Sequence, residues 1–233
     1  MSDVFYRTVG TGPALVLVHG FLGDHRDWRS VVAELRDRFS VITVDLPGHG
    51  RSADALPDAE EPVDLEYMVE SLDRVIGALD TEPVTLVGYS MGGRIAMGYA
   101  LRYPRRVANL VLESASPGIE AADERRNRAA LDDARAERIR EEGLSAFLDD
   151  WYRAELFAEL PAHPSFDAIL ARRIEQDDDA MARIIREMSP GRQMPRWSRL
   201  GRLDVPTLWL AGEQDTKYVD IVRRASDRVP TSE

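Results

Sequence analysis

The chain has 233 residues, 44% of them hydrophobic, which fits one globular domain or one domain with an insertion. It contains no cysteine, so disulfides, thiolate metal sites and a cysteine nucleophile are excluded. Its 30 basic and 41 acidic residues give a net charge of -11, which argues against binding to nucleic acid or to an anionic membrane. The opening stretch "MSDVFYRTVG" carries no signal region, and no apolar run reaches the ~18 residues of a membrane helix. We expect a soluble, cytoplasmic protein.

Strand and helix signals alternate along the chain. Residues 4–9, followed by "GTGP", predict an antiparallel edge hairpin. Short apolar runs bounded by turn residues predict buried strands that begin at Ala14, Val41, Val84, Ala108 and Val205. Apolar residues at three- and four-residue spacing predict helices over 27–38 and 64–79, and a further helix over 91–103. This alternation predicts an α/β fold with a mostly parallel sheet and helices on both faces.

The strand signal disappears between residues 117 and 203, where the sequence is helical and heavily charged. Gly143 is expected to end a helix, and the acids at 177–179 suit a helix N-terminus. Strand signals then resume. We therefore predict an inserted helical cap over 117–203, between a first core segment over 1–116 and a second over 204–233.

The stretch "VGYSMGGR" places Ser90 where a buried strand ends and a helix begins. This is the setting of a nucleophile elbow, although a glycine-rich turn with an incidental serine is the alternative. The "HGF" loop after the first buried strand supplies the backbone N–H of Phe21, which can form an oxyanion hole with that of Met91. We expect structural roles for His19 and His49.

"GEQD" ends the fifth predicted strand and places Asp215 where a carboxylate that orients a catalytic histidine belongs. A loop aspartate without that role is the alternative. The order HGF, DLPGHGRS, GYSMGGR, helical cap, GEQD resembles the α/β-hydrolase superfamily. The finer stretches "HGFLGDHRDW", "LESASPGI", "FLDDWYRAELF" and "AGEQDTKY" resemble the 2-succinyl-6-hydroxy-2,4-cyclohexadiene-1-carboxylate synthases, which are pyruvate-releasing lyases of menaquinone biosynthesis.

The resemblance implies a small polyanionic substrate, 2-succinyl-5-enolpyruvyl-6-hydroxy-3-cyclohexene-1-carboxylate, and neither a cofactor nor a metal. It implies that Ser90, activated by a histidine, removes a ring proton before pyruvate is eliminated. The residues implied to hold the substrate are Tyr89, Arg94, Arg128, Trp151 and Arg172. Arginine suits this role because its planar guanidinium binds carboxylate at two points. The alternatives are that Arg128 and Arg172 pair with nearby acids and that Trp151 belongs to the cap core.

The family's triad needs a histidine after Asp215, whereas the four histidines of the chain are His19, His25, His49 and His163. We expect that the chain is truncated, that it lacks the last strand and helix of the fold, and that these 233 residues alone are inactive or nearly so. His163 in the cap or a partner chain are the weaker candidates for the base. A generic hydrolase of esters or carbon–carbon bonds and a non-catalytic binding protein stay open as functions, and the sequence does not indicate the oligomeric state.

Overall fold

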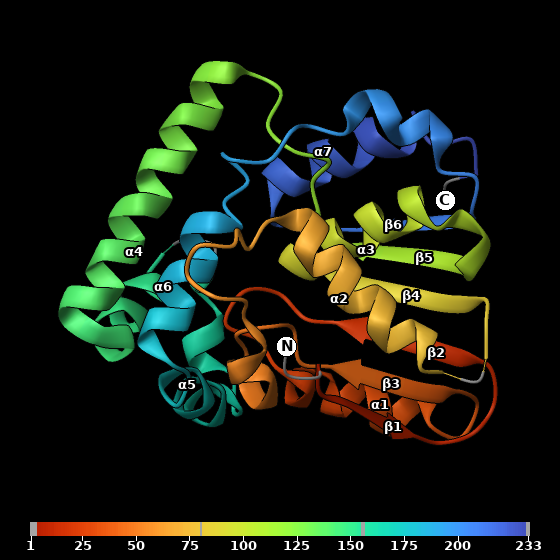
Figure 1. Ribbon diagram of the computed structural model, residues 1–233, viewed down its shortest axis with the longest axis horizontal. Coiled ribbons are helices and arrows are strands. Elements are labelled where there is room, and N and C mark those ends of the chain that lie inside the picture. The colour runs from red at the N-terminus through yellow and green to blue at the C-terminus, as the bar shows by residue number, and fades with distance from the viewer. Residues whose placement is uncertain (1–3, 80, 155–156, 232–233) are drawn as a thin grey trace.

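The protein is built around one sheet with the strand order β1-β3-β2-β4-β5-β6 (Figure 1). The computed structural model describes residues 4–79, 81–154 and 157–231, so the extreme ends of both predicted core segments lie outside it. The strands are β1 (Tyr6–Val9), β2 (Ala14–Val18), β3 (Ser40–Val44), β4 (Val84–Tyr89), β5 (Val107–Glu113) and β6 (Thr207–Leu210). All pairs are parallel except β1 with β3. The predicted α/β fold with a mostly parallel sheet is confirmed.

The central strands are apolar on both sides because helices cover both faces of the sheet. All five residues of β2 are buried. Leu15 and Leu17 face helix α1 (Arg29–Leu35), whereas Val16 and Val18 belong to the larger core on the other face. Helices α2 (Leu65–Gly77) and α3 (Met91–Arg102) pack together over that core. A continuous apolar strand is typical of such a sheet, since successive side chains point to opposite faces.

The expected hairpin at the N-terminus is wrong. Strand β1 is antiparallel and lies at the edge, but it pairs with β3, with Tyr6 opposite Val44. The chain then turns at Gly10, whose φ of +88° favours glycine and where a Cβ would come within 2.2 Å of the carbonyl oxygen of Arg36. Because β2 enters the sheet on the other side of β3, the short "GTGP" turn does not join hydrogen-bonded neighbours.

The cap helices lie together beside the sheet, on the left of Figure 1. They are α4 (Ala122–Trp151), α5 (Phe166–Ile174) and α6 (Asp178–Glu187). The helical geometry of α4 breaks at Gly143, which has a φ of +81°, and the side chain of Asp177 caps α6 by accepting from the N–H of Ala180 at 2.8 Å. Both sequence expectations are thereby confirmed. None of the described helices has the length and hydropathy of a membrane span.

Strand β6 is the last strand of the described sheet, and helix α7 (Thr216–Ser226) follows it in the chain. The chain returns from α7 to the edge of β6 that faces away from β5, where the carbonyl of Thr231 accepts from the N–H of Thr207 at 3.0 Å. Leu208 and Leu210 are 39% and 42% exposed. Among the described residues, β6 is thus the edge strand at this end of the sheet, and its exposed side chains are apolar.

Gly92 is expected to tolerate no side chain. A Cβ at this position would lie 2.3 Å from the carbonyl oxygen of Val18 and 2.4 Å from that of His19, and backbone cannot move aside cheaply. Overpacking of this kind should lower the free energy of unfolding by about 2–3 kcal/mol in Gly92→Ala. Gly212→Ala is the control, because nothing lies within 4 Å of its Cβ, and should change it by less than about 0.5 kcal/mol. Urea denaturation that gave equal stabilities would contradict this packing.

Candidate active site

Ser90 lies in a sharp turn between β4 and α3. Its φ of 53° and ψ of -110° are rarely adopted by a residue other than glycine, and its backbone N–H donates to the carbonyl of Glu113 at 2.9 Å. Strain held by neighbouring structure is common at functional sites. This strand–turn–helix arrangement is that of a nucleophile elbow.

Two backbone amides lie near Ser90, in the segments that follow the adjacent strands β2 and β4. Met91 is the first residue of α3, so its N–H has no acceptor within the helix. Phe21 follows β2, and within the described part of the chain no backbone carbonyl accepts from its N–H. The loop is close, since a Cβ on Gly20 would lie 3.3 Å from the Cβ of Ser90. The arrangement is compatible with the predicted oxyanion hole.

The side chains of His19 and His49 contact the backbone of the loops that follow β2 and β3. The Nδ1 of His19 lies 2.8 Å from the carbonyl of Gly20, and its Nε2 accepts from the N–H of Leu46 at 3.0 Å. The Nδ1 of His49 lies 3.1 Å from the carbonyl of Pro47. Both side chains are buried. The predicted structural role of His19 is confirmed, and His49 makes an equivalent backbone contact.

Acidification below neutral pH is expected to destabilise the protein. Burial lowers the pKa of His19 and of His49 from the ordinary value of 6.5, so the unfolded chain binds protons that the folded protein does not. As the pH falls through 6.5, the free energy of unfolding should drop by up to about 1.4 kcal/mol per pH unit for each histidine. Urea titrations between pH 7.5 and 5.5 measure this slope. His49→Asn keeps a donor for Pro47 and should roughly halve the slope, and a slope unchanged in this variant would contradict the assignment.

Two cavities meet at Ser90. The first, which we call the arginine cavity, has a volume of about 680 Å³ and is lined by Ser90, Arg94, Arg128, Lys217 and Tyr218 among others. The second, which we call the aromatic cavity, has a volume of about 490 Å³ and is lined by Phe21, Tyr89, Ser90, Trp151, Phe157, His163 and Arg172 among others. The structure thus divides the predicted substrate residues into two groups that share the serine.

In the arginine cavity, Arg94 differs from the other predicted arginines. Its Nη1 donates to the carbonyl of Met188 at 2.9 Å and to Oε1 of Gln193 at 2.6 Å. Among the described residues no carboxylate lies within 4.0 Å of this guanidinium. Burial lowers its pKa to about 10, so it stays charged at neutral pH. Arg128, in contrast, pairs with Asp132 at 2.7 Å, the alternative left open by the sequence.

In the aromatic cavity, Trp151 packs against Phe21 and Phe157, with ring centroids 6.0 and 5.8 Å apart. Trp151 therefore belongs to a packed cluster and lines the cavity as well. Arg172 donates from Nη2 to Oδ1 of Asp27 at 3.0 Å. Asp27 also accepts from Nη2 of Arg173 at 2.5 Å, so Arg172 shares this carboxylate with a second arginine. Arg172 thus pairs with a nearby acid, as Arg128 does, which is the alternative left open by the sequence.

Asp215 lies after β6 and caps α7, its Oδ1 accepting from the N–H of Tyr218 at 3.1 Å. It is outside the walls of both cavities, and in the described chain no histidine contacts it. The Ser90 hydroxyl makes no hydrogen bond to a described residue. His163 is the described histidine on the aromatic cavity wall, and its Nδ1 accepts from the N–H of Ser165 at 3.2 Å.

Three residues of this site were missed by reasoning from the sequence. Lys217 and Tyr218 line the arginine cavity from the first turn of α7, and Gln193 contacts Arg94 from the segment after α6. Lys217 and Tyr218 directly follow the "GEQD" motif, a signal that could have found them. Gln193 has no such signal, because it meets Arg94 only through tertiary packing.

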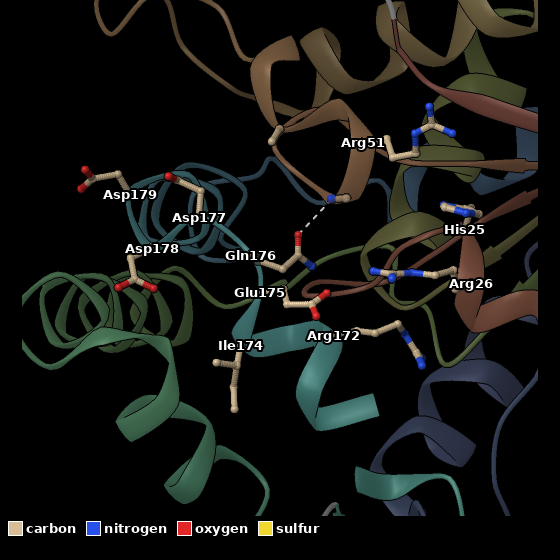
Figure 2. Close-up of a pocket in the computed structure, with 12 residues that line it drawn as sticks. His25, Arg26, Arg51, Arg172, Ile174, Glu175, Gln176, Asp177, Asp178 and Asp179 are labelled. Atoms are coloured by element: carbon tan, nitrogen blue, oxygen red, sulfur yellow. Dashed lines mark hydrogen bonds between the residues drawn. The ribbon is translucent and has the colours of Figure 1, made fainter. Parts of the chain in front are cut away.

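A separate cleft of about 910 Å³ opens between cap and core and does not include Ser90. Figure 2 shows Arg26 and Arg172 along it, opposite Glu175, while Gln176 accepts from the N–H of Gly50 at 3.0 Å. The cleft combines both signs of charge, and its described lining includes no serine, threonine or cysteine. The candidate active site is therefore the pair of cavities at Ser90.

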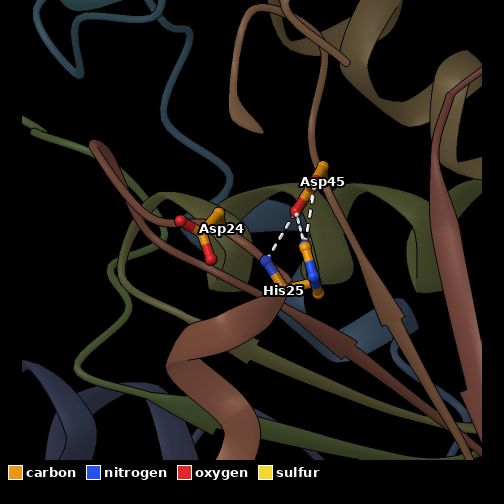
Figure 3. A group of neighbouring side chains, drawn as sticks. All are labelled: Asp24, His25 and Asp45. Carbon is orange, nitrogen blue, oxygen red and sulfur yellow. Dashed lines mark hydrogen bonds and ion pairs between the residues drawn. The ribbon is translucent and has the colours of Figure 1, made fainter. Parts of the chain in front are cut away.

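Asp24, His25 and Asp45 form a compact group of possible metal ligands (Figure 3). The oxygens of Asp45 already accept from the backbone N–H of His25, from its Nδ1 at 2.9 Å and from the N–H of Arg51. Asp24 pairs with Arg26 at 2.9 Å. These bonds account for the group as a loop-stabilising cluster.

The fold and the serine elbow define an enzyme scaffold of the α/β-hydrolase class, and the model of the alpha/beta hydrolase fold family matches residues 13–229. The 2-succinyl-6-hydroxy-2,4-cyclohexadiene-1-carboxylate synthase of Serratia proteamaculans is 35% identical over 214 residues, which are 91% of this chain and 81% of that protein. The chain therefore belongs to the family of 2-succinyl-6-hydroxy-2,4-cyclohexadiene-1-carboxylate synthases.

Two further comparisons place the chain against its relatives. The solved structure of MenH from S. aureus has a TM-score of 0.92 and 34% identity, and covers 100% of this chain and 88% of that one. Protein PHYLLO of Arabidopsis thaliana is 35% identical over 218 residues, but the chain spans only 13% of the length of that protein.

Proposed function

We propose that the chain carries the site of a lyase that eliminates pyruvate from 2-succinyl-5-enolpyruvyl-6-hydroxy-3-cyclohexene-1-carboxylate in the cytoplasm. In this proposal a base at Ser90 takes a ring proton and the electron pair forms a ring double bond. The carbon–oxygen bond to the enolpyruvyl group then breaks, and the departing enolate takes up a proton to become pyruvate. The amides of Phe21 and Met91 stabilise the negative charge that develops.

The observation that carries the proposal is the contact of Ser90 with a cavity whose Arg94 has no described carboxylate partner. A partly buried cation is costly unless an anion balances it, so this cavity favours an anionic ligand in a protein with a net charge of -11. Lys217 adds positive charge on the same wall, which also carries the acidic residues Glu120, Glu124 and Asp220. Tyr89 and Trp151 offer apolar surface on the other side of Ser90.

A steady-state assay at high protein concentration tests the reaction class. Release of pyruvate from the enolpyruvyl substrate, lost in Ser90→Ala, is the expected result. Turnover of simple aryl esters without pyruvate release would instead support a generic hydrolase.

A binding function with little turnover is the second candidate. It is favoured by the Ser90 hydroxyl, which contacts no described histidine, and by Asp215, which caps a helix instead of orienting an imidazole. A serine hydroxyl is a weak nucleophile and base without an adjacent group to take its proton. We propose that the 233-residue chain binds the substrate far better than it converts it.

A further inference from the structure

The guanidinium of Arg94 is held by neutral groups. Its Nη1 donates to the carbonyl of Met188 and to Oε1 of Gln193, at 2.9 and 2.6 Å. Other arginines that line the cavity are bound to acids, Arg128 to Asp132 and Arg224 to Glu120. Arg94 is therefore fixed in position, while its charge is not neutralised by a described neighbour.

The orientation of Gln193 is set by its own contacts. Gln193 is buried, with 9% of the residue exposed, and its Nε2 donates to the carbonyl of Met188 at 3.2 Å. Because the amide nitrogen is used there, the amide oxygen must face Arg94. Gln193 does not itself line the cavity, so it acts on a ligand only through Arg94.

We propose that Gln193 is a positioning residue that orients Arg94 with a neutral carboxamide and so leaves its charge for a carboxylate of the ligand. Glutamate has nearly the same shape but carries a negative charge. At position 193 it would form a tight ion pair with Arg94 at a distance where buried charges attract strongly. The identity of the ligand rests on the proposed function above.

Calorimetric titration with 2-succinyl-6-hydroxy-2,4-cyclohexadiene-1-carboxylate tests the proposal through two variants. Gln193→Glu should weaken binding at least about tenfold, since the new carboxylate competes with the ligand for the charge-assisted hydrogen bond of Arg94. Gln193→Met removes the acceptor without adding charge and should weaken binding less than about threefold. Equal losses in both variants would show a merely structural role, and wild-type affinity in Gln193→Glu would also overturn the proposal.

A thermal unfolding cycle gives a second readout that needs no ligand. Gln193→Glu is introduced into the wild type and into Arg94→Met. With Arg94 present the new carboxylate gains a partner, whereas in the Arg94→Met background it is buried alone. Gln193→Glu should therefore lower the Tm of Arg94→Met by at least about 2–4 °C more than it lowers the Tm of the wild type. Equal effects in both backgrounds would overturn the proposal. Failure of the wild type to bind the probe would refute the proposed function, while this cycle would still decide the role of Gln193.

Discussion

Replacing Arg94 by alanine is expected to weaken binding of the relatives' product, 2-succinyl-6-hydroxy-2,4-cyclohexadiene-1-carboxylate, by about 10- to 100-fold. The substitution removes a charged donor on the cavity wall that has no described carboxylate partner, and hydrogen bonds to charged groups contribute about 1.5–3 kcal/mol. The affinity should also fall with added salt in the wild type and depend less on salt in the variant. Calorimetry at two ionic strengths measures both effects.

Arg126→Ala is the matched control for this experiment. Arg126 lies on the same cap helix as Arg128, its side chain is 71% exposed, and it pairs with Asp123 outside the cavity. Its removal should leave the affinity unchanged. Equal affinities of Arg94→Ala and the wild type would mean that the ligand does not use the arginine cavity.

Formation of 2-succinyl-6-hydroxy-2,4-cyclohexadiene-1-carboxylate by the 233-residue chain is expected to be about 10²- to 10⁴-fold slower than by the synthase of Serratia proteamaculans, because a positioned general base contributes about that factor. The Ser90 hydroxyl makes no hydrogen bond to a described residue, so no described group is placed to accept its proton. A serine-reactive phosphonate should label Ser90 correspondingly slowly. Parallel labelling of both proteins, followed by mass mapping, measures the difference.

Labelling at the rate of the relative would show that a working base is present. His163→Ala would then identify it, since His163 is the described histidine on the wall of the aromatic cavity. Loss of labelling in that variant would assign the base to the cap. Unchanged labelling would exclude His163.

Much of the fold was predictable because its signals are local. Buried parallel strands are continuous apolar runs, as in β2, and glycine or aspartate marks helix ends, as at Gly143 and Asp177. The hairpin prediction failed because the pairing of a strand depends on the whole sheet. Strand β3 follows helix α1 in the chain and inserts between β1 and β2. No pattern within residues 4–18 contains that information.

In the candidate active site, too, only the features set by local sequence were predictable. Ser90 and its neighbouring amides follow from a motif whose geometry is local. The ion pairs of Arg128 with Asp132 and of Arg172 with Asp27 differ in this respect: the first spans one helical turn, and the second joins segments far apart in the chain. Whether an arginine's charge is free depends on such contacts, so Arg94 could be distinguished from Arg172 only in three dimensions.

We propose above that the cavities at Ser90 bind a small polyanion through its carboxylates. The most direct measurement is a calorimetric titration of the 233-residue chain with 2-succinyl-6-hydroxy-2,4-cyclohexadiene-1-carboxylate and with its dimethyl ester, which has the same ring but no charge. We expect the carboxylate form to bind and the ester to bind at least about tenfold more weakly. Absence of binding, or equal affinity for the two compounds, would contradict it.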